Sequence, residues 1–137
     1  MDRFNKTVLD NAKAFLCWSK FPDLSIQLIE QDQAIGYFVP PSDRGTIYLF
    51  YEKNEKDFSN ALFLLFHEAG HYLQFLRDKE TSSFPAPLSQ EQITHEEDAW
   101  DLGRSLLIEF FEAQSISTDR LNQYDLFSKI CLETYRP

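Results

Sequence analysis

What the sequence lacks excludes several kinds of protein. It has no excess of basic residues: the formal net charge is −9, and its 13 Lys and Arg residues are scattered singly among acids. No basic run and no zinc-knuckle spacing offers a footprint for nucleic acid, and the overall field repels phosphate. We therefore expect no nucleic acid among its partners.

Long apolar segments and a cysteine framework are missing as well. The N-terminus carries mixed charge and lacks the apolar core of a secretory signal, and the longest apolar run near the middle of the chain, 61–66, is too short to cross a bilayer. We expect no membrane segment and a cytoplasmic location. The two cysteines, Cys17 and Cys131, sit among apolar neighbours, which favours buried free thiols over a disulfide.

The chain is long enough for one compact domain, 1–137, with a hydrophobic fraction of 43%. Apolar periodicity predicts four helices, at about 2–18, 57–78, 89–112 and 118–133. Three strand-like runs lie between the first two helices, at 24–30, 34–39 and 46–51. The break between the first two strands is short enough for a hairpin, so we expect an α+β fold with a small three-stranded sheet that is at least partly antiparallel.

The sequence His67-Glu68-Ala69-Gly70-His71 lies in the middle of the second predicted helix. Residues four apart on a helix share a face, so His67 and His71 can point two imidazole nitrogens at one ion. Glu68 is turned about a third of the way round the helix and can reach a metal-bound water. Zinc would lower the pKa of that water toward about 7, and Glu68 would act as the general base.

The alternative interpretation is an amphipathic helix whose histidines are ordinary boundary residues. From the composition of this chain, H-E-x-x-H should arise by chance in roughly one such sequence in two hundred. Two of the three histidines in the chain lie in the motif, and no proline interrupts the helix. The motif therefore favours zinc.

A catalytic zinc takes three protein ligands, so a third must come from elsewhere in the chain. The metzincin continuation is excluded, because Gln74 and Arg77 occupy the positions of its glycine and third histidine. The remaining candidates are the acids at the start of the third helix, within 94–101.

Helical geometry orders these acids. Glu96 shares the apolar stripe of Ala99 and Gly103, whose small size would let this helix approach the motif helix closely. Glu97 lies about a hundred degrees away. We choose Glu96 as the third ligand and keep Glu97 as the second choice.

H-E-x-x-H followed about 25 residues later by E-x-x-A-W resembles the gluzincin clan of zinc peptidases, and the small size resembles its shortest members, the minigluzincins. The resemblance implies one zinc ion held by His67, His71 and Glu96, with Glu68 as the catalytic base. It also implies that the strand before the motif helix forms the rim of the cleft and pairs with a peptide substrate.

One position departs from this pattern. Many gluzincins place an acid four residues after the ligand glutamate to orient a histidine, and this chain has Trp100 there. Asp98 or Asp101 is the candidate replacement. For the group that stabilises the oxyanion the sequence offers four candidates, namely His95, Tyr48, Tyr72 and Arg104.

The leading hypothesis is a zinc metalloendopeptidase that hydrolyses peptide bonds in a peptide or protein substrate. The alternative is a catalytically inactive or latent metal-binding domain that serves as a regulatory or interaction module. In a latent form, the C-terminal residues 133–137 could fold into the cleft.

Overall fold

The computed structural model describes residues 3–33, 35–39, 45–77 and 89–135. Its elements follow one another as α1 (Lys6–Ala14), the π-helical segment η1 (Phe15–Lys20), β1 (Ser25–Gln31), β2 (Ile35–Val39), β3 (Thr46–Glu52), α2 (Ser59–Arg77), α3 (Gln90–Ala113), the 3-10 turn η2 (Thr118–Arg120) and α4 (Leu121–Glu133).

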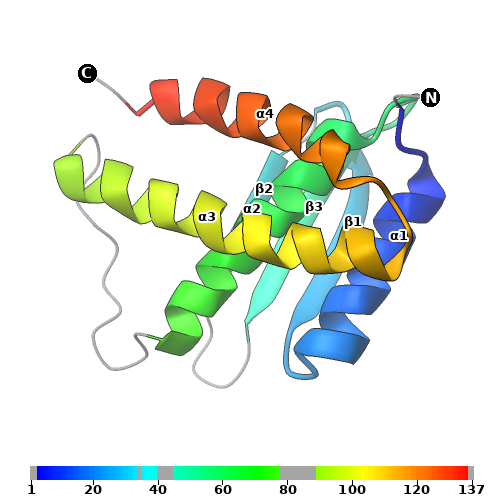
Figure 1. The fold of residues 1–137 in the computed structure, drawn as a ribbon, viewed down its shortest axis with the longest axis horizontal. Coiled ribbons are helices and arrows are strands. Elements are labelled where there is room, and N and C mark those ends of the chain that lie inside the picture. The colour runs from blue at the N-terminus through cyan, green and yellow to red at the C-terminus, as the bar shows by residue number, and fades with distance from the viewer. Residues whose placement is uncertain (1–2, 34, 40–44, 78–88, 136–137) are drawn as a thin grey trace.

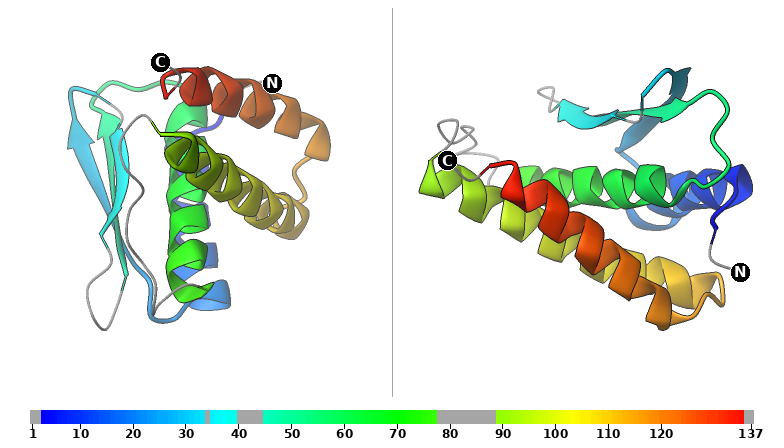
Figure 2. Two further views of the ribbon diagram at one scale, coloured as in Figure 1. Left: turned by 90° about the vertical axis from the view of Figure 1, so that its left-hand side faces the viewer. Right: turned by 90° about the horizontal axis from the view of Figure 1, so that it is seen from above.

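Helix α2 lies at the centre of the fold. The sheet packs on one side of it and α3 on the other, with α1 beside it and α4 against α3 (Figure 2). Most of its side chains are buried, including those of His67, Glu68 and Ala69, because protein surrounds this helix on several sides. The H-E-x-x-H motif therefore sits in the interior of the fold and not on an exposed helix face.

The predicted arrangement of the sheet is wrong. The first two strands do not form a hairpin: β3 lies between β1 and β2, and β1 pairs with β3 in parallel, from Ser25 opposite Thr46 to Gln31 opposite Glu52 (Figure 1). Strand β2 pairs with the other side of β3, antiparallel to it. The link from β1 to β2 crosses two strand spacings of about 4.8 Å, which the three residues between Gln31 and Ile35 are enough to span, so its shortness does not require a hairpin.

This strand order also overturns the expectation that the strand before the motif helix is a free rim for a peptide. Strand β3 carries a hydrogen-bonded neighbour on each side over most of its length. Its backbone groups are therefore already paired. In the described part of the sheet, the edges are formed by β1 and β2.

Several predicted helix limits change. Helix α1 begins at Lys6, after the Asn5 side chain caps the Val8 amide, and regular α-helix gives way to η1 at Phe15. The predicted cap at Ser89 is confirmed, since its hydroxyl accepts from the Gln92 amide at 3.1 Å. The predicted end of the motif helix at Asp78 and the loop 79–88 lie outside the described residues.

The contact between α2 and α3 is close enough to require small residues. A Cβ added at Gly70 would overlap the carbonyl oxygen of Ala99, and one added at Gly103 would overlap that of Phe66. Ala99 itself is completely buried. The predicted close approach at Ala99 and Gly103 is therefore confirmed, and it brings the start of α3 over the motif.

No helix in the described ranges is both long and apolar enough to span a bilayer. Cys17 and Cys131 are reduced thiols, but both are half-buried rather than fully buried.

Candidate metal centre

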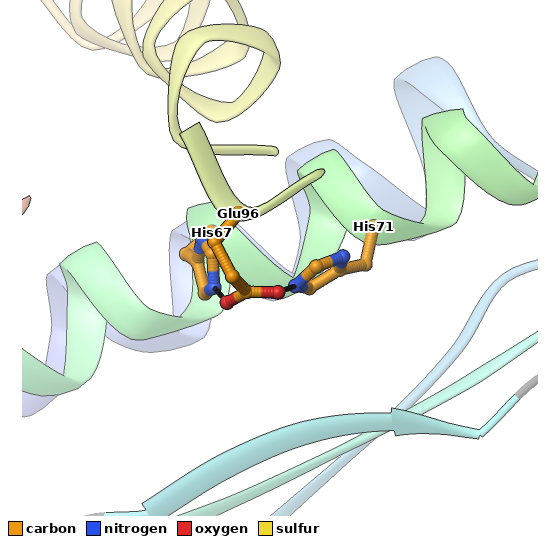
Figure 3. A group of neighbouring side chains, drawn as sticks. All are labelled: His67, His71 and Glu96. Atoms are coloured by element: carbon orange, nitrogen blue, oxygen red, sulfur yellow. Dashed lines mark hydrogen bonds and ion pairs between the residues drawn. The ribbon is translucent and has the colours of Figure 1, made fainter. Parts of the chain in front are cut away.

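Three side chains from two helices meet over the motif (Figure 3). The Glu96 carboxylate, from the second turn of α3, reaches between the two imidazoles of α2. Its Oε1 lies 3.1 Å from Nε2 of His67 and its Oε2 lies 3.0 Å from Nε2 of His71. Glu97, the second choice for this position, is exposed to solvent and is not a member of this group. Of the two acids, the structure brings Glu96 to the histidines.

The group fits a metal ion by its geometry and by its donor atoms. One ligand atom from each of the three residues lies within 4.8 Å of the others. Around a tetrahedral zinc ion with bonds of about 2.0–2.1 Å, ligand atoms lie about 3.3 Å apart. The two Nε2–carboxylate separations, each to a different oxygen of Glu96, are close to this value, and the group as a whole spans no more than 4.8 Å. Two imidazole nitrogens and a carboxylate oxygen suit a divalent transition metal, and three protein ligands leave a coordination position open.

The protonation states of the three groups depend on burial and on one another. Burial would raise the pKa of Glu96, but its hydrogen bonds to the two histidines outweigh this and hold the pKa far below its usual range. For His67, burial outweighs the opposing hydrogen bond with Glu96, and the pKa is lowered to about 4. Burial also acts to lower the pKa of His71, but the hydrogen bond to Glu96 and the negative charge of Glu68 raise it overall.

The ring of His67 is held by stacking. The Trp100 ring lies 4.0 Å from it between centroids, at an interplanar angle of 20°. No group in the described ranges forms a hydrogen bond with Nδ1 of His67, which is buried. The gluzincin pattern has an orienting acid at this position, whereas here the Trp100 ring stacks on His67.

The ring of His71 is held by hydrogen bonds. Its Nδ1 lies 2.7 Å from Oε1 of Gln74, whose Nε2 donates to the His95 carbonyl at 2.8 Å and to Oδ2 of Asp98 at 2.9 Å. Arg77 in turn donates to Asp98 at 2.8 Å. Asp98, one of the two predicted replacement acids, thus reaches the site only through Gln74.

The sequence provides little indication of this role for Gln74. In the sequence, Gln74 and Arg77 only exclude a metzincin continuation, because their contacts depend on how α3 crosses α2. The other predicted replacement acid, Asp101, is exposed.

Glu68, the predicted general base, is buried with 6% of its surface exposed. Its negative charge contributes to the raised pKa values of both His71 and Tyr135, so it lies in their electrostatic neighbourhood. The arrangement places a buried carboxylate near the three candidate ligands without making it part of that group.

Tyr135, beyond the end of α4, is a further residue at the site. Its hydroxyl donates to Oε1 of Glu96 at 3.1 Å, and burial together with the charge of Glu96 raises its pKa. We did not predict Tyr135 individually. The only indication in the sequence was the suggestion that the C-terminal residues fold toward the cleft.

The four candidates for an oxyanion-stabilising group lie in different surroundings. The His95 ring lies against that of His71, 5.1 Å away between centroids. Tyr72 is buried against Phe21. Arg104 makes a bidentate ion pair with Asp125, and Tyr48 lies within β3. Among these, the described structure places His95 in ring contact with a candidate ligand.

Comparison with known proteins finds no matching family model, no matching curated protein and no matching solved structure. The resemblance to the gluzincins therefore depends on the two sequence segments alone.

Proposed function

We propose that this chain is a zinc-dependent metalloendopeptidase of gluzincin type that hydrolyses peptide bonds in a peptide or protein substrate in the cytoplasm. The observation that carries the proposal is the Glu96 carboxylate between the two motif imidazoles, contributed by a separate helix. A chance H-E-x-x-H on an ordinary buried helix would not need a third donor of suitable chemistry at this distance.

In the proposed reaction, the zinc ion and the residues of the chain have different roles. One zinc ion, when bound, supplies a Lewis acid that activates water and polarises the scissile carbonyl. His67, His71 and Glu96 hold the ion. Glu68 accepts a proton during attack and returns it to the leaving nitrogen, a role that suits a buried carboxylate beside the ligands.

The substrate is proposed to lie along β2. Both sides of β3 are paired, so an added strand needs another edge of the sheet. Of the two edges in the described sheet, β2 packs directly against the motif helix α2. A peptide that extends the sheet there would run beside the helix that carries the ligands.

Two substitutions test the metal and the chemistry separately. In the wild-type chain we expect near-stoichiometric zinc by elemental analysis and cleavage of an unfolded protein substrate. Glu68→Gln should keep the zinc and lose most of the cleavage, by about 10²-fold or more, because only the proton carrier is removed. Equal cleavage by this variant and the wild type would refute the role of Glu68 as base.

The contact of Tyr135 with Glu96 favours a second candidate, a latent metal-binding domain. In that form the C-terminal end covers the open side of the site, and the domain acts as a regulatory or interaction module until it is displaced. Removal of residues 134–137 should then increase cleavage. Unchanged cleavage after this truncation would contradict latency.

A further inference from the structure

Gln74 is a buried amide at the crossing of the two helices that carry the candidate ligands. Its exposed fraction is 4%, which is low for a glutamine, and it lies on α2 three residues after His71. Both ends of its side chain form hydrogen bonds: Oε1 with Nδ1 of His71 at 2.7 Å, and Nε2 with the His95 carbonyl at 2.8 Å and Asp98 at 2.9 Å. A buried polar side chain with this many partners is a constraint on its surroundings.

The partners of Gln74 determine which way its amide points. The carbonyl oxygen of His95 and the carboxylate of Asp98 are both acceptors, so the group between them must be the NH₂ end of the amide. The reversed amide would place an oxygen against two oxygens. Oε1 therefore faces His71, and Nδ1 of His71 must be the donor.

A proton on Nδ1 has a direct consequence for metal binding. In a metal-bound imidazole one nitrogen carries the proton and the other coordinates the ion. With the proton held on Nδ1 by Gln74, the lone pair of His71 is on Nε2. That is the nitrogen that lies 3.0 Å from Glu96 and faces the other ligands.

The same amide connects the two helices. His95 and Asp98 flank Glu96 in α3, so the two bonds donated by Gln74 fix the segment that supplies the third ligand. Asp98 is fixed in turn by Arg77, at 2.8 Å. Gln74 thus links the orientation of one ligand to the placement of another.

We propose that Gln74 is a positioning residue of the metal centre, which holds the Nδ1-protonated form of His71 and fixes the distance between His71 and Glu96. The inference depends on the proposed metal site. Carboxylates and backbone carbonyls commonly orient metal-bound histidines. A neutral amide does so here without adding a second negative charge beside Glu96, and it has two protons left to bind the neighbouring helix.

The test compares zinc affinities, measured by competition with a chelator, in variants of the full chain. Gln74→Leu keeps most of the volume and removes the hydrogen bonds, so zinc affinity should fall about 10- to 100-fold. Gln90→Leu is the matched control: the same change on the exposed first residue of α3, whose amide donates to Thr94 at 3.5 Å and makes no other hydrogen bond within the described ranges. Its affinity should stay within about 2-fold of the wild type.

A third variant separates hydrogen bonding from packing. Gln74→Met matches the length and volume of the glutamine but has no donor and only a weak acceptor, so zinc affinity should fall as it does in Gln74→Leu. If Gln74 only filled space between the helices, Met would keep the zinc affinity of the wild type. A zinc affinity of Gln74→Met or Gln74→Leu equal to that of the wild type overturns the proposal.

One measurement needs no variant. In the zinc-loaded wild-type chain, NMR should show a proton on Nδ1 of His71 that exchanges slowly with water. Coordination of zinc through Nδ1 would overturn the proposal, and a wild-type chain that binds no zinc would overturn it together with the metal centre. A chain that binds zinc tightly but cleaves no peptide would refute the proposed reaction and leave the role of Gln74 intact.

Discussion

The two histidines of the motif occupy the same helix face but are held in opposite ways. His67 lies under the Trp100 ring and has a buried Nδ1 with no hydrogen-bond partner in the described ranges. His71 is hydrogen-bonded through Gln74 to the neighbouring helix. The pKa of His67 is lowered and that of His71 is raised, although Glu96 contacts both.

This difference separates two ways to orient a ligand. A stacked ring fixes the plane of an imidazole but does not select which nitrogen carries the proton. A hydrogen bond to Nδ1 fixes the ring and also selects the nitrogen that carries the proton. Substitutions beside His67 should therefore act mainly on stability, and substitutions beside His71 mainly on zinc affinity.

Removal of Glu96 should have the largest effect, because both histidines depend on it. Glu96→Ala leaves two ligands, and we expect zinc affinity to fall by more than about 100-fold. Elemental analysis after dialysis measures the loss, and Glu97→Ala, one position away and exposed, is the control. If Glu97→Ala loses zinc and Glu96→Ala keeps it, the assignment of the third ligand is wrong.

Trp100→Ala tests the stacked half of the comparison. Trp100 is 4% exposed and packs against Tyr124 as well as His67, so its truncation should cost about 3–5 kcal/mol of unfolding free energy. Chemical denaturation of the metal-free chain measures this cost. A change below about 1 kcal/mol would show that the stack does not support the fold. Compared with Trp100→Ala, Gln74→Leu should lower the unfolding free energy less and the zinc affinity more.

How much of the site the sequence predicts follows from the range of each interaction. The position of Glu96 next to the histidines was predictable because helical periodicity places it on the stripe of Ala99 and Gly103, an argument that is local to one helix. The roles of Gln74 and Tyr135 depend on where α3 and the C-terminal end lie relative to α2. No spacing within a single element contains that information.

The sheet shows the same limit. The extent of each strand follows approximately from alternation and turn residues, as Thr46–Glu52 illustrates. The partner of each strand does not, since β3 enters between two strands that precede it in the chain. A short link suggested a hairpin, and the non-local parallel pairing of β1 with β3 overruled it.

The opposite pKa shifts predict a stability maximum for the metal-free chain. The pKa of His67 is about 4 in the folded chain and about 6.5 when unfolded, so the unfolded state binds more protons between these values. Stability is therefore lost as pH falls from 6.5 toward 4, by on the order of 2 kcal/mol. The raised pKa of His71 has the opposite sign: its contribution is present below pH 6.5 and is lost as pH rises through the folded value.

Denaturation as a function of pH, with and without His67→Gln, measures the two slopes. The substitution should flatten the decline between pH 6.5 and 4 and leave the alkaline decline in place. If stability on the acid side falls as steeply in the variant, carboxylates and not His67 cause the decline.

Tyr135→Phe should have the smallest effect on the fold and sharpens the comparison at the atom that touches His67. The Tyr135 hydroxyl donates to Oε1 of Glu96, the same oxygen that faces Nε2 of His67. A buried hydrogen bond to a charged group contributes about 1.5–3 kcal/mol to stability. Tyr135 is half exposed, so loss of its hydrogen bond should lower the stability of the metal-free chain by less than this. Cleavage decides what the contact does: increased cleavage in this variant supports a latent state in which the phenol covers the site, and reduced cleavage with zinc retained makes Tyr135 a participant in the reaction. With both cleavage and zinc affinity unchanged, the contact would serve only to anchor the C-terminal end of α4.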